Sequence, residues 1–509
     1  MNDERDSGVF TLAKQGSITF VGNIIGKALG FAFVVIATRL VTPSEYGIFT
    51  LGLSVVLFVQ GFSSLNIYRS VDYFVPKLLN ETDYGRAKKT IQNVFIIGIV
   101  ASTFGAIAIF LTRDQIATLF NEPRLGLVLS LFMLLIPLQT INRTLLASFN
   151  SIKKMKYRVA MRDIASPLTR IVGASVLVVG GAGLLGLVGG YIFGVAVTVL
   201  GGAILLIRGA GWIRNTAPEP ISNRDLFSYS LPLVLAGVIY SIVGQVDYFV
   251  IGYFLSADNV GQYRVAYLLS SNMLIVLSAI TPVFKPMVAE SSSNDSVLEG
   301  SYRLATRWVM MLTFPLAITL ILAPDVFLTL LFTPEYSLAS ASVIALSVGY
   351  LLNASFGPEG MMLEGLGNTR LTLVNTVVLV SVNGSLDVLL VPRFGILGAG
   401  IATGSALTIA GLAGVVEIYF LRSIHPYSLR LFRVSIAALL PLLVGRVLVT
   451  YLADTLQTAL FLPVLVVVTY VIGLRITGGF TNDDRAVASR IDSRLGFSVV
   501  HPIIGSPRN

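Results

Sequence analysis

Blocks of 18–25 mostly apolar residues recur along almost the whole chain, and no other feature limits its fold as strongly. A block of this length forms a helix that crosses ~30 Å of hydrocarbon at ~1.5 Å per residue. In lipid, backbone N–H and C=O groups find partners only within such a helix or a closed barrel. A transmembrane barrel would show short alternating segments, and the run 94–111 does not alternate. The pattern predicts an all-α polytopic membrane protein.

The composition agrees with this interpretation. Of the 509 residues, 54% are hydrophobic and 12% are charged, against roughly 25% charged in soluble domains. Too little polar surface is present to cover a water-soluble globule. A pI near 9.6 could indicate a nucleic-acid partner, but we exclude nucleic acid because the basic residues lie between the apolar blocks.

Few residues are available for a metal or redox centre. The chain has no cysteine, hence no thiol nucleophile and no cysteine-based zinc site. Its two histidines, His425 and His501, both fall in predicted loops. We therefore expect neither a metal site nor a cofactor.

Hydropathy divides the chain into fourteen predicted spans. The first apolar run is too long for a signal-peptide core and has no small-x-small cleavage site after it, so we interpret it as an uncleaved span. The spans are predicted at 17–38, 47–65, 91–112, 125–146, 163–181, 184–207, 229–251, 261–283, 304–323, 338–356, 371–391, 396–420, 432–451 and 456–474.

The distribution of Lys and Arg between the spans predicts the orientation. If the N-terminus is cytoplasmic, the cytoplasmic segments hold 25 of these residues and the outer loops hold 4. This bias follows the positive-inside rule and predicts that both termini are cytoplasmic. No gap between spans is long enough for a soluble catalytic domain, so we do not expect an enzyme.

Two stretches of the chain resemble each other at a constant spacing. Residues Arg39–Phe49 follow the first span, and Tyr253–Tyr263 follow the seventh, 214 positions later. We therefore predict two pseudo-symmetric six-helix lobes related by an axis along the membrane normal, followed by two more helices. The predicted division is 1–215 for the first lobe, 216–425 for the second, 426–475 for the last two spans and 476–509 for a cytoplasmic tail.

Positive side chains inside the spans are the candidates for substrate binding, because a charge at the bilayer centre costs about 2.5–3.5 kcal/mol. Lys27 lies at least ten residues from either end of the first span and shares a polar stripe with Asn23. Gly22, Gly26 and Gly30 form a neighbouring stripe whose spacing allows close helix packing. That packing would turn Lys27 toward a cavity. A structural hydrogen bond to helix carbonyls is the alternative.

The intramembrane arginines mostly lie near the ends of their spans, where a long side chain can reach the interface instead. Arg170 is the next deepest cation. The substrate-binding candidates are Lys27, Asn23, Arg143, Arg170, Arg264, Arg307 and Arg446. A basic cluster is either a topology determinant attracted to anionic lipids or the cytoplasmic entrance for the substrate; it consists of Lys153, Lys154, Lys156 and Arg158.

Acidic residues are distributed unevenly among the spans. Apart from Asp163 at a boundary, spans 1–6 hold no Asp or Glu, whereas later spans hold Asp247, Asp387 and Glu417. A first lobe with cations and no acid suits an anionic head group such as pyrophosphate. Asp247 and Asp387 are candidates for ion coupling or for structural roles.

Four stretches carry a resemblance to a known family. The chain is similar to the multidrug/oligosaccharidyl-lipid/polysaccharide exporter superfamily, and most of all to its prokaryotic oligosaccharide-lipid flippases of the Wzx type. Together with the span count, the resemblance covers roughly residues 10–475, and Arg264 stands where the family leads us to expect a small polar residue. The four stretches are Ala37–Phe49, Ser228–Leu233, Asp247–Tyr267 and Pro392–Gly400.

The resemblance implies a fourteen-helix, two-lobe fold that moves a lipid-linked phosphate or pyrophosphate oligosaccharide outward by alternating access. Such flippases serve surface polysaccharide, S-layer or N-glycan assembly. The expected partners are a polyprenyl or dolichyl lipid-linked sugar, membrane lipids and glycan-assembly enzymes. A multidrug or metabolite exporter of the same fold is the alternative. A membrane sugar polymerase or ligase is a third hypothesis, but it would need a large outer loop, and the longest one, near Pro324–Ser337, has about 14 residues.

Overall fold

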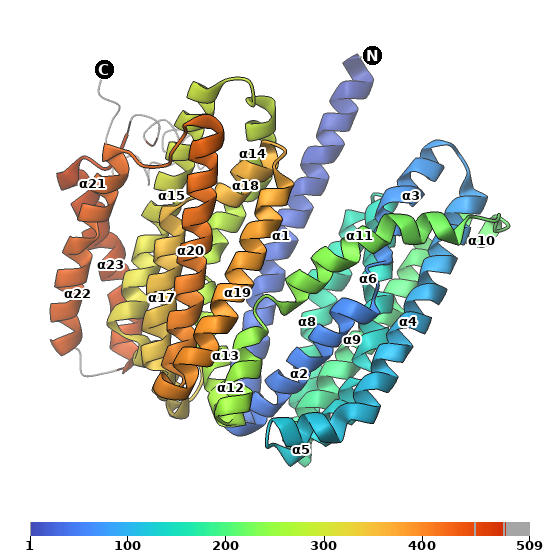
Figure 1. Ribbon diagram of the computed structural model, residues 1–509, viewed down its shortest axis with the longest axis horizontal. Coiled ribbons are helices and arrows are strands. Elements are labelled where there is room, and N and C mark those ends of the chain that lie inside the picture. Colours follow the sequence, from blue (N-terminus) through green and yellow to red (C-terminus); the bar gives the residue numbers. More distant parts are fainter. Residues whose placement is uncertain (1, 452–454, 482–483, 485–509) are drawn as a thin grey trace. The chain divides into compact units, whose positions relative to one another are not determined.

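The computed structural model describes residues 2–451, 455–481 and 484, so most of the predicted tail 476–509 lies outside the described residues. The chain divides into two compact units, unit 1 at 1–264 and unit 2 at 265–509, with the division inside α13 (Figure 1). The lobe boundaries predicted from the repeat stay a prediction.

The described residues are predominantly helical in both units. Unit 1 contains α1 (Asn2–Leu40), α2 (Pro43–Ser63), α3 (Tyr68–Asn80), α4 (Tyr84–Leu119), α5 (Pro123–Phe132), α6 (Leu135–Ser151), α7 (Met155–Val159), η1 (Ala160–Ala165), α8 (Ser166–Leu177), η2 (Val178–Ala182), α9 (Gly183–Gly209), α10 (Gly211–Asn215), α11 (Asn223–Ile242), α12 (Val246–Phe254) and the first half of α13 (Ala257–Ser271). Unit 2 continues with α14 (Leu274–Glu290), α15 (Asp295–Leu322), α16 (Pro324–Leu331), η3 (Pro334–Ala339), α17 (Ser340–Ser355), α18 (Glu359–Gly365), α19 (Thr369–Phe394), α20 (Ile396–Arg422), α21 (Leu429–Ala437), α22 (Leu439–Tyr451) and α23 (Thr455–Thr477).

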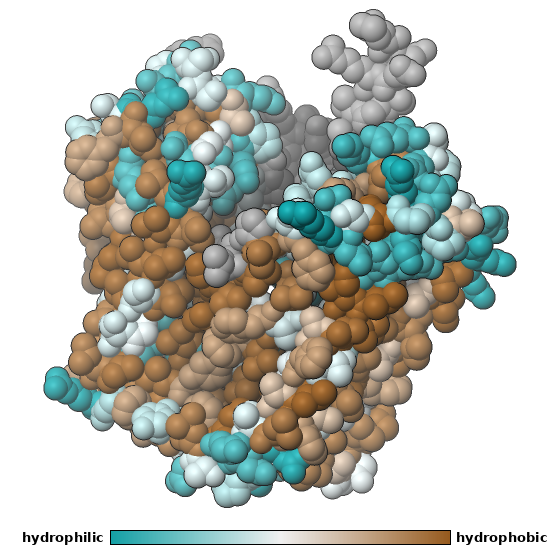
Figure 2. Space-filling model, turned by 45° about the vertical axis from the view of Figure 1, so that its right-hand side comes forward, coloured by the Kyte–Doolittle hydropathy of each residue, from teal (hydrophilic) through white to brown (hydrophobic). Residues whose placement is uncertain are grey.

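Most of these helices are long and apolar enough to cross a membrane. In the described part of the chain eleven helical stretches meet this condition, or twelve if the bent pair α13 and α14 forms one span. Every predicted span falls on one to three consecutive observed helices. The face drawn in Figure 2 is hydrophobic over most of its area, and hydrophilic residues gather toward the top and the bottom of the view. The predicted all-α polytopic membrane protein is therefore confirmed, whereas the count of fourteen spans stays a prediction.

One helical stretch, Met155–Gly209, is much too long for a single crossing. Its 55 residues would extend about 80 Å as one helix, against ~30 Å of hydrocarbon. The chain reverses at Gly181 and Gly183, whose φ angles of 92° and 47° suit glycine. Beyond the reversal α9 packs back along α8, and Gly190 lies directly on Gly173. This reversal lies where the sequence predicts the boundary between the spans 163–181 and 184–207.

Prolines explain two interruptions within predicted spans. The span predicted at 125–146 is divided between α5 and α6, and Pro137 stands near the start of α6. The span predicted at 432–451 is divided between α21 and α22, and Pro441 holds the same place in α22. A proline lacks the N–H donor, and its ring clashes with the carbonyl four residues earlier, which ends the preceding helix.

The first of the two similar stretches forms a well-capped helix start. Thr42 accepts a hydrogen bond from the backbone N–H of Glu45, and the Glu45 carboxylate accepts one from the Thr42 N–H at 3.1 Å. With Pro43 in the first turn, this capping box sets the beginning of α2. The motif residues Thr42, Pro43 and Glu45 are thus accounted for by local helix chemistry.

The two similar stretches also pack against each other within unit 1. A Cβ atom on Gly47 would overlap the carbonyl oxygen of Ala257, and a Cβ atom on Gly261 would overlap the carbonyl oxygen of Pro43. The spacing of 214 residues pairs Pro43 with Ala257 and Gly47 with Gly261. The contact is therefore reciprocal, as at a two-fold axis, and both glycines are needed because backbone meets backbone there.

We expect Gly47→Ala to destabilise the protein by about 1–3 kcal/mol, because a methyl group cannot rotate away from a backbone carbonyl. The measurement is the unfolding temperature in detergent. Gly300→Ala is the control, since that glycine is exposed on α15 with open space around its Cβ position. It should be neutral or slightly stabilising. A Gly47→Ala protein as stable as the wild type would contradict the reciprocal packing.

A buried ion pair joins the C-terminal segment to the helices of unit 2. Arg307 of α15 donates to both carboxylate oxygens of Asp484, at 2.6 and 2.7 Å. The same carboxylate accepts from the Thr481 backbone N–H at 2.8 Å and from the Trp308 indole N–H at 2.8 Å. Arg307 is 2% exposed and Asp484 is 5% exposed. The pair fixes the chain that follows α23 against α15.

This ion pair should make stability depend on pH in the acid range. Burial alone would raise the pKa of the Asp484 carboxyl, but the hydrogen bonds from Arg307, Thr481 and Trp308 outweigh burial and hold its pKa below the ordinary value. The stabilisation is complete above the unfolded pKa of about 3.9 and is lost as pH falls through the lower folded pKa. The difference in unfolding temperature between wild type and Asp484→Asn should therefore be constant near neutral pH and shrink below about pH 4. If this difference in unfolding temperature stayed unchanged down to pH 2, the ion pair would not be the source of the pH dependence.

Candidate functional site

A cavity of about 250 Å³ lies within unit 1. Its walls come from α1, α2, α8, α9, α12 and the first turns of α13. On α2 the lining residues Tyr46, Thr50, Ser54 and Leu57 recur every three or four positions, so one face of that helix borders the cavity. Gly30 brings α1 to the wall without a side chain. Six helices from different parts of unit 1 therefore share one chamber.

Arg170 enters the cavity from α8. Its backbone approaches α9 closely because residue 194 is a glycine. One guanidinium nitrogen, Nη1, donates to the Tyr191 hydroxyl at 3.0 Å, and the guanidinium carbon lies 4.2 Å from the centre of the same ring. Among the described residues, no acceptor reaches its buried Nε. Tyr191 thus holds the side chain in place while part of its donor capacity stays unused.

Arg264 enters the same cavity from α13. Its Nη1 donates to the Tyr248 hydroxyl at 2.9 Å, and Tyr46 is a second hydrogen-bonding neighbour. Both tyrosines are almost fully buried, at 1% and 2% exposure. Gly261, one turn earlier, brings α13 against α2, so the reciprocal glycine contact also sets the position of Arg264. The two predicted candidates Arg170 and Arg264 are thus brought together.

The charge of this cavity is positive. None of the described residues that line it is Asp or Glu. Asp247 is adjacent in sequence to the lining residue Tyr248, but its carboxylate accepts from the Tyr263 hydroxyl at 2.6 Å and is not part of the wall. Two guanidinium groups in a partly enclosed space can donate several charge-assisted hydrogen bonds to a phosphate or carboxylate. The arrangement is suited to an anion.

The other candidates of α1 do not line this cavity. Lys27 is exposed and Asn23 is half-buried. Gly22 packs on Val159 and Gly26 packs on Asp163, so two of the three stripe glycines make close helix contacts as predicted. The substrate-binding roles of Lys27 and Asn23 stay predictions.

The candidates of unit 2 have other surroundings. Arg307 is occupied by Asp484, so we do not include it in the binding site that we propose. Arg446 is exposed on α22. Asp387 is fully buried on α19, and Asn383 one turn earlier donates to the Thr403 hydroxyl at 3.3 Å. The coupling role of Asp247 and Asp387 stays a prediction.

The predicted cytoplasmic entrance comprises the turn between α6 and α7, with Lys153 and Lys154, and the helix α7, with Lys156 and Arg158. Lys153 has a positive φ of 56°, its carbonyl accepts from the Gln15 amide at 3.2 Å, and Lys156 lies 5.0 Å from the ring centre of Tyr157. The entrance role of these two lysines stays a prediction, as does that of Lys154 and Arg158. In residues 2–451, 455–481 and 484, no three His, Asp or Glu side chains are grouped so that they could hold a metal ion.

Sequence reasoning missed the three tyrosines that position the arginines. Tyr46 and Tyr248 stand in the stretches that carry the family resemblance, Ala37–Phe49 and Asp247–Tyr267. Tyr191 has no such signal, since a single tyrosine in an apolar span is common at membrane interfaces. Only packing reveals its contact with Arg170.

Comparisons with known proteins identify relatives of this chain. The family described as "Polysaccharide biosynthesis protein" matches residues 36–341, more than half of the chain. The chain is 23% identical over 409 residues to the "Probable low-salt glycan biosynthesis flippase Agl15" of Haloferax volcanii, covering 78% of this chain and 81% of that protein.

Two solved structures show that the fold is shared more widely. "Lipid II flippase MurJ, inward closed conformation" superposes with a TM-score of 0.70 at 17% identity, covering 90% of this chain and 98% of that one. An inward-facing multidrug resistance MATE family transporter of the MOP superfamily superposes with a TM-score of 0.62 at 15% identity, covering 78% of this chain and 94% of that one. At these identities the superpositions establish the fold alone.

Proposed function

Because this chain belongs to the polysaccharide biosynthesis protein family, we propose that it is a flippase that translocates a lipid-linked phosphate or pyrophosphate oligosaccharide across the membrane. The observation that supports this proposal is the cavity of unit 1, which has Arg170 and Arg264 in its wall and no carboxylate among its described lining residues. A phosphate group linking lipid and sugar offers the acceptors that the two guanidinium groups require. The name of the Agl15 relative, a glycan biosynthesis flippase, supports the same substrate class.

The direction that we propose is from the cytoplasmic to the outer face. The predicted orientation, with 25 Lys and Arg inside and 4 outside, supports a plasma-membrane protein with both termini in the cytoplasm. The lipid carrier is of the polyprenyl or dolichyl type, and the product serves surface polysaccharide, S-layer or N-glycan assembly. Alternating access follows from the two-lobe repeat. The chain acts as a transporter and leaves sugar bonds to glycan-assembly enzymes.

A drug or metabolite exporter is the second candidate, because the fold is shared with a MATE transporter. An exporter of cations needs carboxylates where the cargo sits. Asp247 and Asp387 are both buried, at 2% and 0% exposure, and Asp247 does not line the cavity. The described cavity therefore favours an anionic cargo over a cationic one.

The test of this function is a deletion strain of the source organism. Lipid-linked glycan should accumulate in the cytoplasmic leaflet, and mass spectrometry of the accumulated lipid would identify the sugar and the carrier. Restoration by the wild-type gene is the control. An unchanged amount and distribution of lipid-linked glycan, together with dye export that depends on Asp247 or Asp387, would replace the flippase by the exporter.

A further inference from the structure

Arg143 of α6 has an unusual environment for a charged side chain in a membrane helix. It is half-buried. Its Nη2 donates to the side-chain oxygen of Gln60 at 3.5 Å, and its guanidinium carbon lies 6.0 Å from the ring centre of Tyr68. A guanidinium group has five N–H donors, so most of its donor capacity is unused among the described residues.

Arg143 differs from Arg303 and Arg307 in having no acidic partner among the described residues. Arg307 pairs with Asp484 at 2.6 Å, and half-buried Arg303 pairs with Glu299 at 2.6 Å. In the described part of the chain, no carboxylate forms an ion pair with Arg143. Asp72 of α3 instead accepts from the Asn150 amide at 3.3 Å. A half-buried charge without a counter-charge is costly, which indicates that an anion completes the site.

Gln60 of α2 supplies a second, independent sign of a missing acceptor. Its side chain is 0% exposed. Its oxygen accepts from Arg143, but its buried amide nitrogen Nε2 has no acceptor among the described residues. A buried donor of this kind normally has a partner, because leaving it unpaired costs about 1–3 kcal/mol. Arg143 and Gln60 thus present N–H groups from two helices, α6 and α2, and each residue has donors without an acceptor among the described residues.

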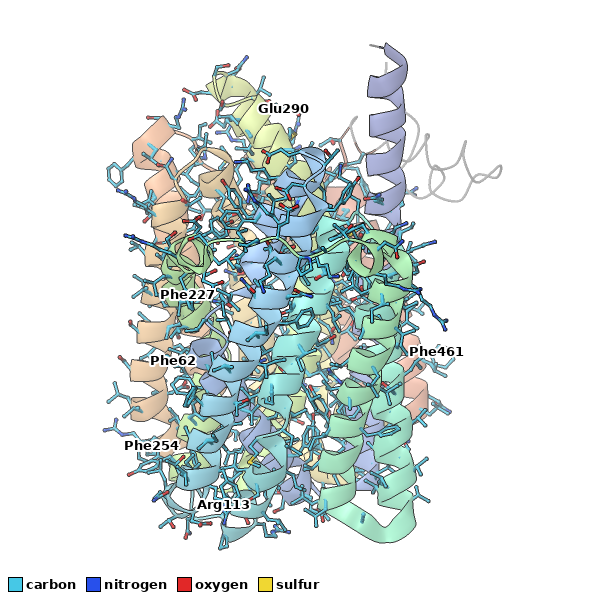
Figure 3. All side chains as sticks on the ribbon, turned by 90° about the vertical axis from the view of Figure 1, so that its right-hand side faces the viewer. Phe62, Arg113, Phe227, Phe254, Glu290 and Phe461 are labelled. Carbon is cyan, nitrogen blue, oxygen red and sulfur yellow. The ribbon has the colours of Figure 1, made fainter. Side chains whose placement is uncertain are left out.

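The position of Gln60 relates this pair to the cavity. Leu53 and Leu57 line the cavity, and Gln60 follows them on the same helical face, at spacings of seven and three residues. Gln60 lies ten residues beyond Thr50, which corresponds to about 15 Å along α2. In Figure 3, Phe62, two residues beyond Gln60, lies between Arg113 at one end of the unit and Phe227 nearer the other. In the predicted orientation, Gln60 is on the cytoplasmic side of the cavity.

We propose that Arg143 and Gln60, beside Tyr68, form an inner anion subsite that binds the phosphate or pyrophosphate of the lipid-linked sugar before it reaches Arg170 and Arg264. This inference rests on the proposed function. The phosphate oxygens accept from the Arg143 guanidinium and from Gln60 Nε2, and the Tyr68 ring lies against the guanidinium. One face of α2 then presents two anion sites in succession along the translocation path.

The experiment isolates the inner subsite by removing the outer one. The full chain carrying Arg170→Ala and Arg264→Ala is purified in lipid nanodiscs and titrated with radiolabelled farnesyl pyrophosphate, a soluble prenyl pyrophosphate that lacks the sugar. This double variant should still bind the probe saturably. Adding Arg143→Ala, or Gln60→Glu, should weaken that binding at least tenfold.

The variant Gln60→Glu distinguishes loss of anion binding from loss of folding. It places a carboxylate beside Arg143, so the fold should be kept or stabilised while the anion is displaced. Arg143→Lys should retain part of the affinity. Arg113→Ala is the matched control, since Arg113 pairs with Asp114 at 3.5 Å away from both sites, and it should leave binding unchanged.

The outcomes separate the inference from the function. If the wild type binds the probe and the double variant binds none, or if Gln60→Glu leaves binding by the double variant unchanged, the inner subsite is refuted and the flippase proposal stands. If the wild type itself binds no farnesyl pyrophosphate, the inner subsite is refuted together with the proposed substrate class.

Discussion

Arg170→Ala and Arg264→Ala should each reduce glycan assembly at the cell surface at least tenfold, and the double variant should abolish it. Each guanidinium can donate charge-assisted hydrogen bonds to the phosphate, worth about 1.5–3 kcal/mol, and about 1.4 kcal/mol corresponds to a tenfold change in affinity. In the protein without cargo, both arginines are held by tyrosine hydroxyls, at 3.0 and 2.9 Å. Among the described residues Arg170 forms no ion pair on which the fold would depend.

The measurement is the surface-glycan level in the deletion strain complemented with each variant, at matched amounts of membrane-inserted protein. Arg170→Lys and Arg264→Lys should be intermediate, because an ammonium group keeps the charge but cannot donate as a planar fork. Tyr191→Phe removes the hydroxyl that positions Arg170 and should cost less than loss of Arg170 itself. Wild-type glycan levels in Arg170→Ala and in Arg264→Ala would refute the role of the cavity.

Arg307→Ala should destabilise the protein by about 3–5 kcal/mol, the largest stability effect that we expect, because it leaves the Asp484 carboxylate buried without its partner. Asp484 would keep its hydrogen bonds from Thr481 and Trp308, which do not neutralise its charge. Replacing both partners by apolar residues, as in Arg307→Met with Asp484→Leu, should recover much of the loss, since neither charge is then stranded.

Chemical denaturation in detergent, followed by tryptophan fluorescence, gives the free energy of unfolding for Arg307→Ala and for the matched set of Arg307→Met, Asp484→Leu and their double variant. Trp308 contacts Asp484 and reports on this region directly. A double variant that is as unstable as the sum of the single variants would show that the two residues act independently. Such additivity would contradict the ion pair as the source of stability.

Positions of helices followed from the sequence wherever length and hydropathy decide them. Each of the predicted spans lies on observed helix, and the reversal at Gly181–Gly183 falls between the spans predicted at 163–181 and 184–207. Interruptions inside spans were not anticipated, although Pro137 and Pro441 were visible in the sequence. A proline can also be tolerated in a membrane helix, where neighbouring helices satisfy the freed carbonyl, so its effect depends on packing.

The candidate site residues show the same difference between what the sequence predicts and what packing decides. Charge inside an apolar span was enough to single out Arg143, Arg170, Arg264 and Arg307, but it treated them alike. In the structure Arg170 and Arg264 share a cavity, Arg143 contacts Gln60, and Arg307 is neutralised by Asp484. Hydropathy also gave no reason to select Gln60, since a single polar amide in a helix attracts no attention until its burial is known.

By itself the sequence determined that this is a helical membrane protein, because the length of its apolar blocks and the missing hydrogen-bond partners in lipid leave one solution. The same local evidence carries the family resemblance, and it predicts the orientation. Only the tertiary structure decided which arginines have counter-charges and which have unused donors. The reason is that each pairing joins residues far apart in the chain, such as 307 with 484 or 60 with 143, which only the folded backbone brings within contact distance.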